Sequence, residues 1–218
     1  MADYKKPDHW QLLARKEGYP ARSVYKLKEM DEKFGLLKNS RNTASNTGFR
    51  ILDIGASPGS WSLYVLRKMG GSGSGAKDFA KGFLAAVDLA PLSREFDKGL
   101  FDGDNFFFVQ GDFTDAAILE KISSKGPYSL IISDAAPATT GSHTVDSARS
   151  LELAEAVTDC AEKTLNPGGS LLIKVFQGGD VAGLLKRFKT LFAVAKSFKP
   201  KACRSESFET YFIGTGKK

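Results

Sequence analysis

The sequence predicts an α/β protein built around one mostly parallel sheet with helices on both faces. Short apolar segments of strand length alternate with segments of helical periodicity along the chain. Nearly every expected strand is followed by a glycine or a charged residue, as in open sheets that bind ligands at their carboxyl edge. The 218 residues are enough for one such domain with a full core.

Seven segments have the length and apolar character of strands. They are residues 51–54, 82–87, 106–110, 128–133, 170–176, 194–198 and 208–213. The last two are expected to close the sheet, which is then seven-stranded.

Helical periodicity marks five segments, of which the first has Val24, Leu27, Met30 and Phe34 on one face. The predicted helices cover residues 21–34, 61–69, 115–123, 146–165 and 181–191, with Asp146 or Ser147 as the cap of the fourth. Three segments are expected to lack regular structure, the first of them being irregular or at most marginally helical. They are residues 4–20, the linker 38–48 and the inserted glycine–serine loop 70–75.

The net charge of +6 is concentrated at the two ends of the chain. Residues 1–50 contain 11 Lys and Arg against 6 Asp and Glu, and residues 170–218 contain 10 against 3. Residues 51–169 contain 10 against 16. This distribution predicts basic ends that contact a polyanion, with scattered solvated lysines as the alternative.

Composition argues against a membrane protein or a disulfide-bonded one. No apolar run approaches the length of a membrane span, and the polar N-terminus resembles neither a signal peptide nor a transit peptide. Cys160 and Cys203 lie far apart without metal-type spacing, which predicts reduced, structural cysteines. We therefore expect a cytoplasmic protein with no membrane partner and no metal site.

Five of the expected strands carry a glycine or a charged residue at or just past their carboxyl ends. These residues are Gly55, Asp88, Asp112, Asp134 and Lys174. One Asp after a strand is usually a turn former or a helix cap, but a succession of such strand ends is less readily explained as turns. The predicted pocket is acidic, which disfavours phosphate and favours hydroxyls, amines or a cation.

The segment ILDIGASPGSW, residues 51–61, directs backbone N–H groups from a small-residue turn at a polar ligand. A dinucleotide site is disfavoured because the turn lacks the second glycine of G-x-G-x-x-G. A hydrolase would fit G-x-S-x-G, with Asp134 and His143 in triad order, but Pro58 has no N–H for the oxyanion hole. S-adenosylmethionine is the third candidate, with a ribose for Asp88 and an adenine amine for Asp112.

Seven segments of the chain carry a family resemblance. They are GYPARSVYKLKEMDEKFGL, LDIGASPGSW, VDLAPL, VQGDF, SDAAP, LNPGGSLLIKVFQG and SESFETYFIGTG. In this order and spacing they resemble the FtsJ/RrmJ-type ribose 2′-O-methyltransferases over essentially the whole chain. The resemblance implies a Rossmann-like class I methyltransferase fold in a single domain, 1–218. Residues 1–48 form a basic helical extension that contributes Lys26, and residues 49–218 form the core.

The resemblance also implies site residues. The family's catalytic tetrad falls on Lys26, Asp134, Lys174 and Glu209, with Glu206 close enough to compete for the fourth place. The cofactor contacts that the resemblance implies are Gly59, Trp61, Asp88, Asp112 and Asp134. Gly55 and Ser57 of the loop are expected as two further cofactor contacts. Ser57 and Ser60 stand where relatives often have Ala and Gly.

The implied activity is methyl transfer from S-adenosylmethionine to a ribose 2′-hydroxyl of RNA. Lys174 is expected to accept the hydroxyl proton, if burial and the Lys26 cation favour its neutral amine. Asp134 would position Lys174 and orient the methyl donor, and Glu209 would orient Lys26 or the ribose.

The expected substrate is large-subunit ribosomal RNA, presented to a monomeric enzyme on a ribosomal particle. A tRNA ribose methyltransferase and a non-catalytic ribosome assembly factor are the alternatives. Basic residues near both ends are expected to hold RNA phosphates. They are Arg15, Lys16, Arg22, Lys28, Lys186, Arg187, Lys189, Lys199, Lys201 and Arg204.

Overall fold

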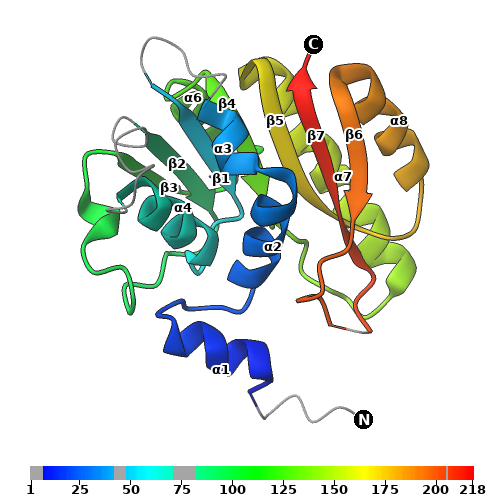
Figure 1. Ribbon diagram of the computed structural model, residues 1–218. Coiled ribbons are helices and arrows are strands. Elements are labelled where there is room, and N and C mark those ends of the chain that lie inside the picture. The colour runs from blue at the N-terminus through cyan, green and yellow to red at the C-terminus, as the bar shows by residue number, and fades with distance from the viewer. Residues whose placement is uncertain (1–6, 42–47, 71–81, 205) are drawn as a thin grey trace.

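A seven-stranded sheet crosses the middle of the molecule, with helices in front of it and behind it (Figure 1). The computed structural model describes residues 7–41, 48–70, 82–204 and 206–218. The strands are β1 (Arg50–Ile54), β2 (Phe83–Asp88), β3 (Phe106–Gln110), β4 (Tyr128–Ser133), β5 (Leu165–Phe176), β6 (Phe192–Phe198) and β7 (Glu209–Lys217).

The strand order across the sheet is β3-β2-β1-β4-β5-β7-β6. Neighbours from β3 to β5 are parallel, whereas β7 runs antiparallel to both β5 and β6. This arrangement confirms the predicted seven-stranded, mostly parallel sheet with helices on both faces.

Two hydrophobic cores separate the helices into two layers. One core lies under α2 (Val24–Phe34), α3 (Leu36–Arg41) and α4 (Ser60–Gly70). The other lies under α6 (Ala116–Ser123), α7 (His143–Thr164) and α8 (Val181–Leu191). Strand β1 is apolar on both faces, because Ile51 enters the first core and Leu52 the second.

Several predicted elements keep their bounds, among them β3, β4 and α8. The structure differs at α1 (His9–Lys16), in a segment expected to be irregular or marginally helical. Asp8 and Gln11 form a capping box there, in which each side chain accepts a hydrogen bond from the other's backbone N–H. This local pair satisfies the backbone N–H groups of Asp8 and Gln11 at the start of the helix.

The start of α7 also differs from the prediction. The helix begins at His143, before the predicted cap. Asp146 instead accepts hydrogen bonds from the backbone N–H groups of Thr140, at 2.7 Å, and Gly141, at 3.2 Å, and so fixes the loop ahead of the helix.

Two expected unstructured segments are described only in part. The linker predicted over 38–48 begins as helix, because α3 continues to Arg41, and residues 42–47 lie outside the described part of the chain. Of the glycine–serine loop, Gly70 ends α4 and the remainder lies outside the described residues.

The antiparallel pairing of β7 brings a late segment of the chain to the carboxyl edge of the parallel strands. Glu209, the first residue of β7, pairs with Phe176, the last residue of β5. Lys174 pairs with Tyr211. Since alternate residues of a strand share a face, these four side chains emerge on the same face of the sheet.

Gly214 of β7 offers a test of this packing, because it lies between Leu171 of β5 and Ala195 of β6. A Cβ atom on Gly214 would lie 2.4 Å from the ring of Phe192, which is buried. We expect Gly214→Ala to lower the free energy of unfolding by about 1–3 kcal/mol, as overpacking usually does. Urea denaturation measures the change.

Gly70→Ala is the matched control, since a Cβ atom there would meet nothing within 4 Å. Equal stability of the two variants would contradict the close packing of β7 against Phe192.

Candidate active site

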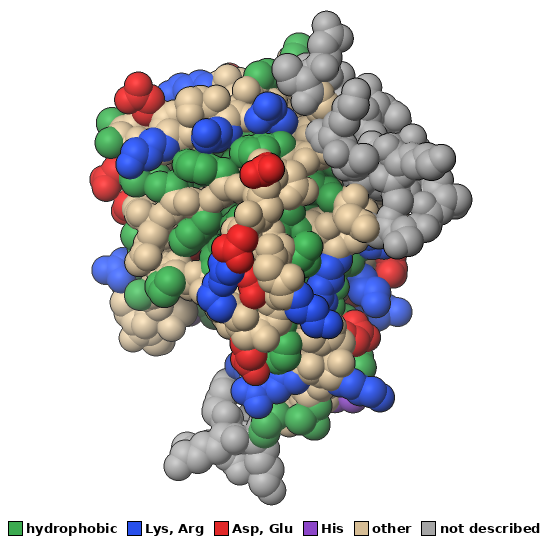
Figure 2. All heavy atoms as spheres, turned by 90° about the vertical axis from the view of Figure 1, so that its left-hand side faces the viewer, with side chains coloured by type: hydrophobic (Ala, Val, Ile, Leu, Met, Phe, Trp, Pro, Cys, Tyr) green, Lys and Arg blue, Asp and Glu red, His purple; other side chains and the backbone are tan. Residues whose placement is uncertain are grey.

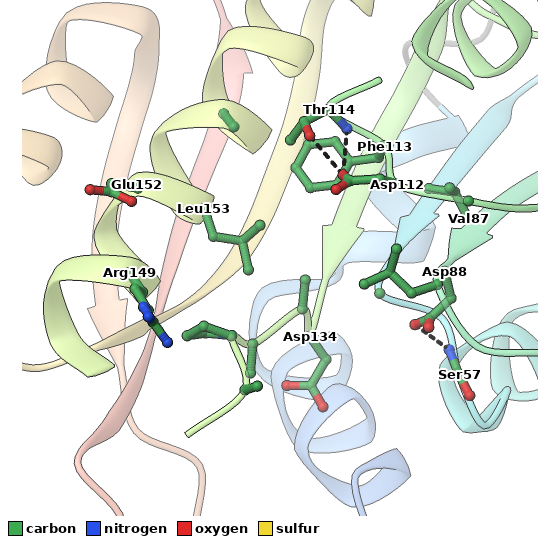
Figure 3. A pocket seen from close by; sticks show the side chains of 18 residues that line it. Ser57, Val87, Asp88, Asp112, Phe113, Thr114, Asp134, Arg149, Glu152 and Leu153 are labelled. Atoms are coloured by element: carbon green, nitrogen blue, oxygen red, sulfur yellow. Dashed lines mark hydrogen bonds between the residues drawn. The ribbon is translucent and has the colours of Figure 1, made fainter. Parts of the chain in front are cut away.

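A cavity of about 570 Å³ opens at the carboxyl edge of β1, β2, β3 and β4 (Figure 3). Five of the predicted cofactor contacts line it, namely Gly55, Ser57, Asp88, Asp112 and Asp134. Figure 3 shows Asp88, Asp112 and Asp134 as separate strand-end carboxylates around the same space. The structure therefore brings these sequence-predicted residues together.

Asp88, at the end of β2, holds the glycine loop against the sheet. One of its oxygens accepts from the backbone N–H of Ser57 at 2.9 Å and the other from that of Ala90 at 2.8 Å. Gly55 has a φ of +79°, and a Cβ atom there would lie 2.6 Å from the Cα atom of Ala135. Only glycine permits this approach of the loop to the end of β4.

The far wall of the cavity combines one carboxylate with apolar side chains. Asp112 accepts from the backbone N–H of Thr114 at 2.9 Å and from its hydroxyl at 2.7 Å, and these bonds lower the pKa of Asp112. Val87, Phe113 and Leu153 supply apolar side chains to the lining of the cavity. A ribose at Asp88 and an adenine amine at Asp112, with the ring among the apolar groups, match these residues.

Gly59 and Trp61, also predicted as cofactor contacts, lie outside this lining. Gly59 has a φ of +106°, and a Cβ atom there would lie 2.9 Å from the Phe101 ring. Trp61 is buried in the core, and its indole N–H donates to the carbonyl of Ser23 at 2.8 Å. In the structure Trp61 ties α4 to the chain that enters α2.

The predicted tetrad gathers at a second cavity of about 470 Å³. Its lining comprises Arg22, Ser23, Lys26, Thr139, Lys174, Phe176, Arg204, Glu206, Ser207, Phe208 and Glu209. Asp134 connects the two cavities, because it lines the first and binds Lys174 of the second.

Asp134 is held by two side chains of the β5–β7 pair. The Nζ atom of Lys174 lies 3.1 Å from its Oδ1 atom and also donates to its main-chain carbonyl at 2.5 Å. The Tyr211 hydroxyl donates to the same Oδ1 atom at 2.7 Å. Burial raises the pKa of Asp134, but the cations of Lys174 and Lys26 and the Tyr211 hydrogen bond outweigh it, so the pKa is lowered.

Lys26 reaches the site from α2 and binds Glu209. Its Nζ atom lies 2.8 Å from both carboxylate oxygens, and the two side chains are only 12% and 10% exposed. Burial lowers the pKa of Lys26, but Asp134 and Glu209 outweigh it and the pKa is raised. Glu206, the competing assignment, is exposed, so Glu209 is the acid that contacts Lys26.

Two residues of the site were missed from the sequence. Tyr211 follows Glu209 by two positions on the same strand, and this alternation was an available signal. Asp53 stands inside the apolar strand β1, is fully buried, and accepts from the Ser62 hydroxyl at 2.7 Å. Its other oxygen has no hydrogen-bond partner among the described residues.

Three of the basic residues predicted to hold RNA have contacts that the structure describes. Arg22 and Arg204 line the second cavity, and Arg22 also donates to Asp8 and to the carbonyl of Ala202. Arg187 of α8 instead pairs with Asp159 and Glu162 of α7, each at 2.7 Å. On the side of the molecule that carries β3, basic side chains are interspersed with acidic ones (Figure 2).

The sequence of the chain shows the protein family to which these two cavities belong. A model described as FtsJ-like methyltransferase matches residues 19–217 of the chain. The chain belongs to the FtsJ-like methyltransferase family. As a member it is a methyltransferase, and S-adenosylmethionine is its methyl donor, in agreement with the residues of the first cavity.

Similar proteins cover almost the full length of the chain. Ribosomal RNA large subunit methyltransferase E of Treponema denticola is 45% identical, with 97% of this chain and 95% of that protein covered. The protein of the same name from Oleidesulfovibrio alaskensis is 44% identical, with 96% and 91% covered. A crystal structure from Plasmodium falciparum, assigned as a ribosomal RNA methyltransferase, has a TM-score of 0.70 and 26% identity, with 91% and 98% covered.

The described residues contain neither a cluster suited to a metal ion nor a helix suited to a membrane. No group of three or more His, Cys, Asp or Glu among them could hold a metal ion. No helix in the described part of the chain is long and apolar enough to span a bilayer.

The ion pairs of Asp134 predict an acid-sensitive contribution to stability. Because its pKa is lowered in the folded protein, this contribution is complete above the unfolded value near 3.8 and is lost as the pH falls through the folded value. We expect Asp134→Asn to cost about 3–5 kcal/mol at pH 7, because it leaves Lys174 buried without its carboxylate. Urea denaturation should show that the difference in free energy of unfolding between the wild type and Asp134→Asn narrows below about pH 4.

The exposed Asp104→Asn is the control and should change stability by less than about 0.5 kcal/mol. If the free energy of unfolding of Asp134→Asn differed from that of the wild type by the same amount down to pH 3, the stabilising ion pair of Asp134 would be contradicted.

The contribution of Asp53 to stability is expected to depend on pH in the opposite direction to that of Asp134. Burial, together with the neighbouring Asp134 and Asp88 carboxylates, raises its pKa to about 7, although the Ser62 hydrogen bond opposes the shift. A carboxyl group with a raised folded pKa destabilises the fold as the pH rises from about 4 to about 7. We therefore expect Asp53→Asn to gain stability relative to the wild type between pH 5 and pH 8, measured by urea denaturation at both values. The same difference at pH 5 and pH 8 would contradict this.

Proposed function

We propose that this methyltransferase acts on a ribose 2′-hydroxyl of RNA, and that its substrate is large-subunit ribosomal RNA. The observation that carries the proposal is the meeting of two buried ion pairs, Lys26–Glu209 and Asp134–Lys174, where the two cavities adjoin. The names of the two relatives at 44–45% identity support ribosomal RNA as the substrate.

The cofactor, when bound, supplies a methyl group on a positively charged sulfur. A ribose hydroxyl is a weak nucleophile, so a group that takes its proton speeds the transfer, typically by about 10²–10⁴-fold. Lys26 is held as a cation by its two carboxylate neighbours. This leaves Lys174, which faces the second cavity beside Asp134, as the lysine that accepts the proton. To do so, the Lys174 ammonium of the resting ion pair first gives its proton to water, and the neutral amine then takes the proton of the ribose hydroxyl.

The other residues position these two amines. Asp134 holds Lys174 through both its carboxylate and its main-chain carbonyl, and Tyr211 fixes the Asp134 carboxylate in turn. Glu209 holds Lys26 through both carboxylate oxygens. These contacts hold the tetrad side chains beside the space in the second cavity that a ribose hydroxyl would enter.

In this proposal the extension 1–48 and the core 49–218 act as one domain. The contacts that support it join α2 to α4: Trp61 donates to the Ser23 carbonyl, and the Tyr64 hydroxyl donates to Asp31 at 2.9 Å. We further propose that the enzyme acts as a monomer on a ribosomal particle in the cytoplasm. A tRNA substrate and an assembly factor without activity are outcomes of the following test.

Transfer of a tritiated methyl group tests the function directly. We expect the wild type to label large ribosomal subunits that lack the modification, and not tRNA. The labelled nucleotide should resist alkaline cleavage, because methylation removes the 2′-hydroxyl that attacks the neighbouring phosphate. We expect Lys174→Met to lower kcat by about 10²–10⁴-fold, because it removes the proton acceptor and keeps the length of the side chain.

Lys196→Met is the matched control, since Lys196 is an exposed lysine on the edge strand β6. Equal labelling by the wild type and Lys174→Met would overturn the role of Lys174. Labelling of tRNA alone would overturn the substrate, and no labelling of either RNA by the wild type would favour the assembly factor.

A further inference from the structure

We propose that Phe208 is the platform on which the base of the target nucleotide stacks while its ribose lies at the tetrad. The inference rests on the proposed function and adds to it the group that holds the base. Phe208 is outside the tetrad and outside the cofactor cavity.

Phe208 occupies the wall of the second cavity, one residue before Glu209. Its backbone is fixed, because its carbonyl accepts from the N–H of Gln177 at 2.8 Å and extends the pairing of β7 with β5. The same cavity is lined by Lys26 and Lys174. A nucleotide whose ribose reaches these two amines therefore has its base within the cavity that Phe208 borders.

Two neighbouring rings hold the Phe208 ring in place. The Phe176 ring lies edge-on to it, with ring centroids 4.8 Å apart, and the His143 ring lies 4.4 Å away at a 44° tilt. Exposure increases along this series, since Phe176 is buried, Phe208 is half-buried and His143 is exposed. A ring already held in one orientation loses little conformational freedom when a base stacks on it.

A role in the core alone accounts less well for this ring. Phe188, which does fill the core, packs against both Phe192 and Phe212 and is fully buried. Phe208 keeps part of its ring open to a cavity whose other walls carry Arg22 and Arg204. Guanidinium groups suit phosphates and an aromatic face suits an unstacked base, so the lining matches a nucleotide as a whole.

Stacking on an aromatic ring tolerates every base, so Phe208 is expected to hold the nucleotide rather than to select it. Its contribution belongs to substrate binding, because no atom of the ring takes part in proton or methyl transfer. A loss of the ring should therefore raise KM for RNA and leave kcat nearly unchanged.

The test compares Phe208→Leu with Phe208→Tyr in methyl transfer to large ribosomal subunits that lack the modification. Leucine keeps apolar bulk without a π face, and tyrosine keeps the ring. We expect Phe208→Leu to raise KM for the subunits roughly 10- to 100-fold, and Phe208→Tyr to stay within about threefold of the wild type. His143→Ala, which removes one supporting ring, should give an intermediate rise in KM.

Phe198→Leu is the matched control, because Phe198 is a half-buried ring of β6 that packs on Phe34 and does not line the cavity. The dissociation constant of S-adenosylmethionine should be unchanged in every variant, which shows that the fold and the first cavity are intact. An unchanged KM in Phe208→Leu would overturn the platform, and so would a loss of kcat alone. If the wild type itself labels no RNA, the proposed function fails and not the platform alone.

Discussion

The site depends on the carboxylate of Asp134, which stands at the end of β4 where the two cavities adjoin. It binds Lys174 and Tyr211 directly, and its charge also helps to keep Lys26 protonated. Lys174 and Tyr211 are less than 10% exposed, so neither polar group has water as an easy substitute for Asp134. The relative placement of the ends of β4, β5 and β7 therefore depends on the negative charge of Asp134.

The direction of β7 makes this arrangement possible. Parallel strands alone would send only their carboxyl ends to the ligand edge, whereas an antiparallel strand begins there. Glu209 and Tyr211 thus reach the edge from the first residues of β7, opposite Phe176 and Lys174 of β5. The N-terminal extension supplies the remaining cation, Lys26, from a helix that packs on the same face of the sheet.

Two neighbouring buried carboxyl groups have pKa shifts of opposite sign. Asp134 has the Lys174 cation at 3.1 Å and the charge of Lys26 nearby, so its pKa is lowered. Asp53 has one hydroxyl donor and two acidic neighbours, and its pKa is raised. The difference lies in the partners and not in the depth, because desolvation opposes ionisation in both. Sequence alone marks both only as an Asp at or near the end of an apolar strand.

The sequence by itself determined the strand and helix alternation, the carboxyl-edge carboxylates and the family, because periodicity, strand ends and motif spacing are properties of the chain. It predicted the tetrad only through family resemblance, and it missed Tyr211 and the capping box of α1. It also placed Trp61 in the cofactor lining, whereas the structure packs it in the core against α2. The capping box is a local pair that the sequence does contain. Only the tertiary structure decided the contacts of Tyr211 and Trp61, since these depend on which distant segments of the chain pack together.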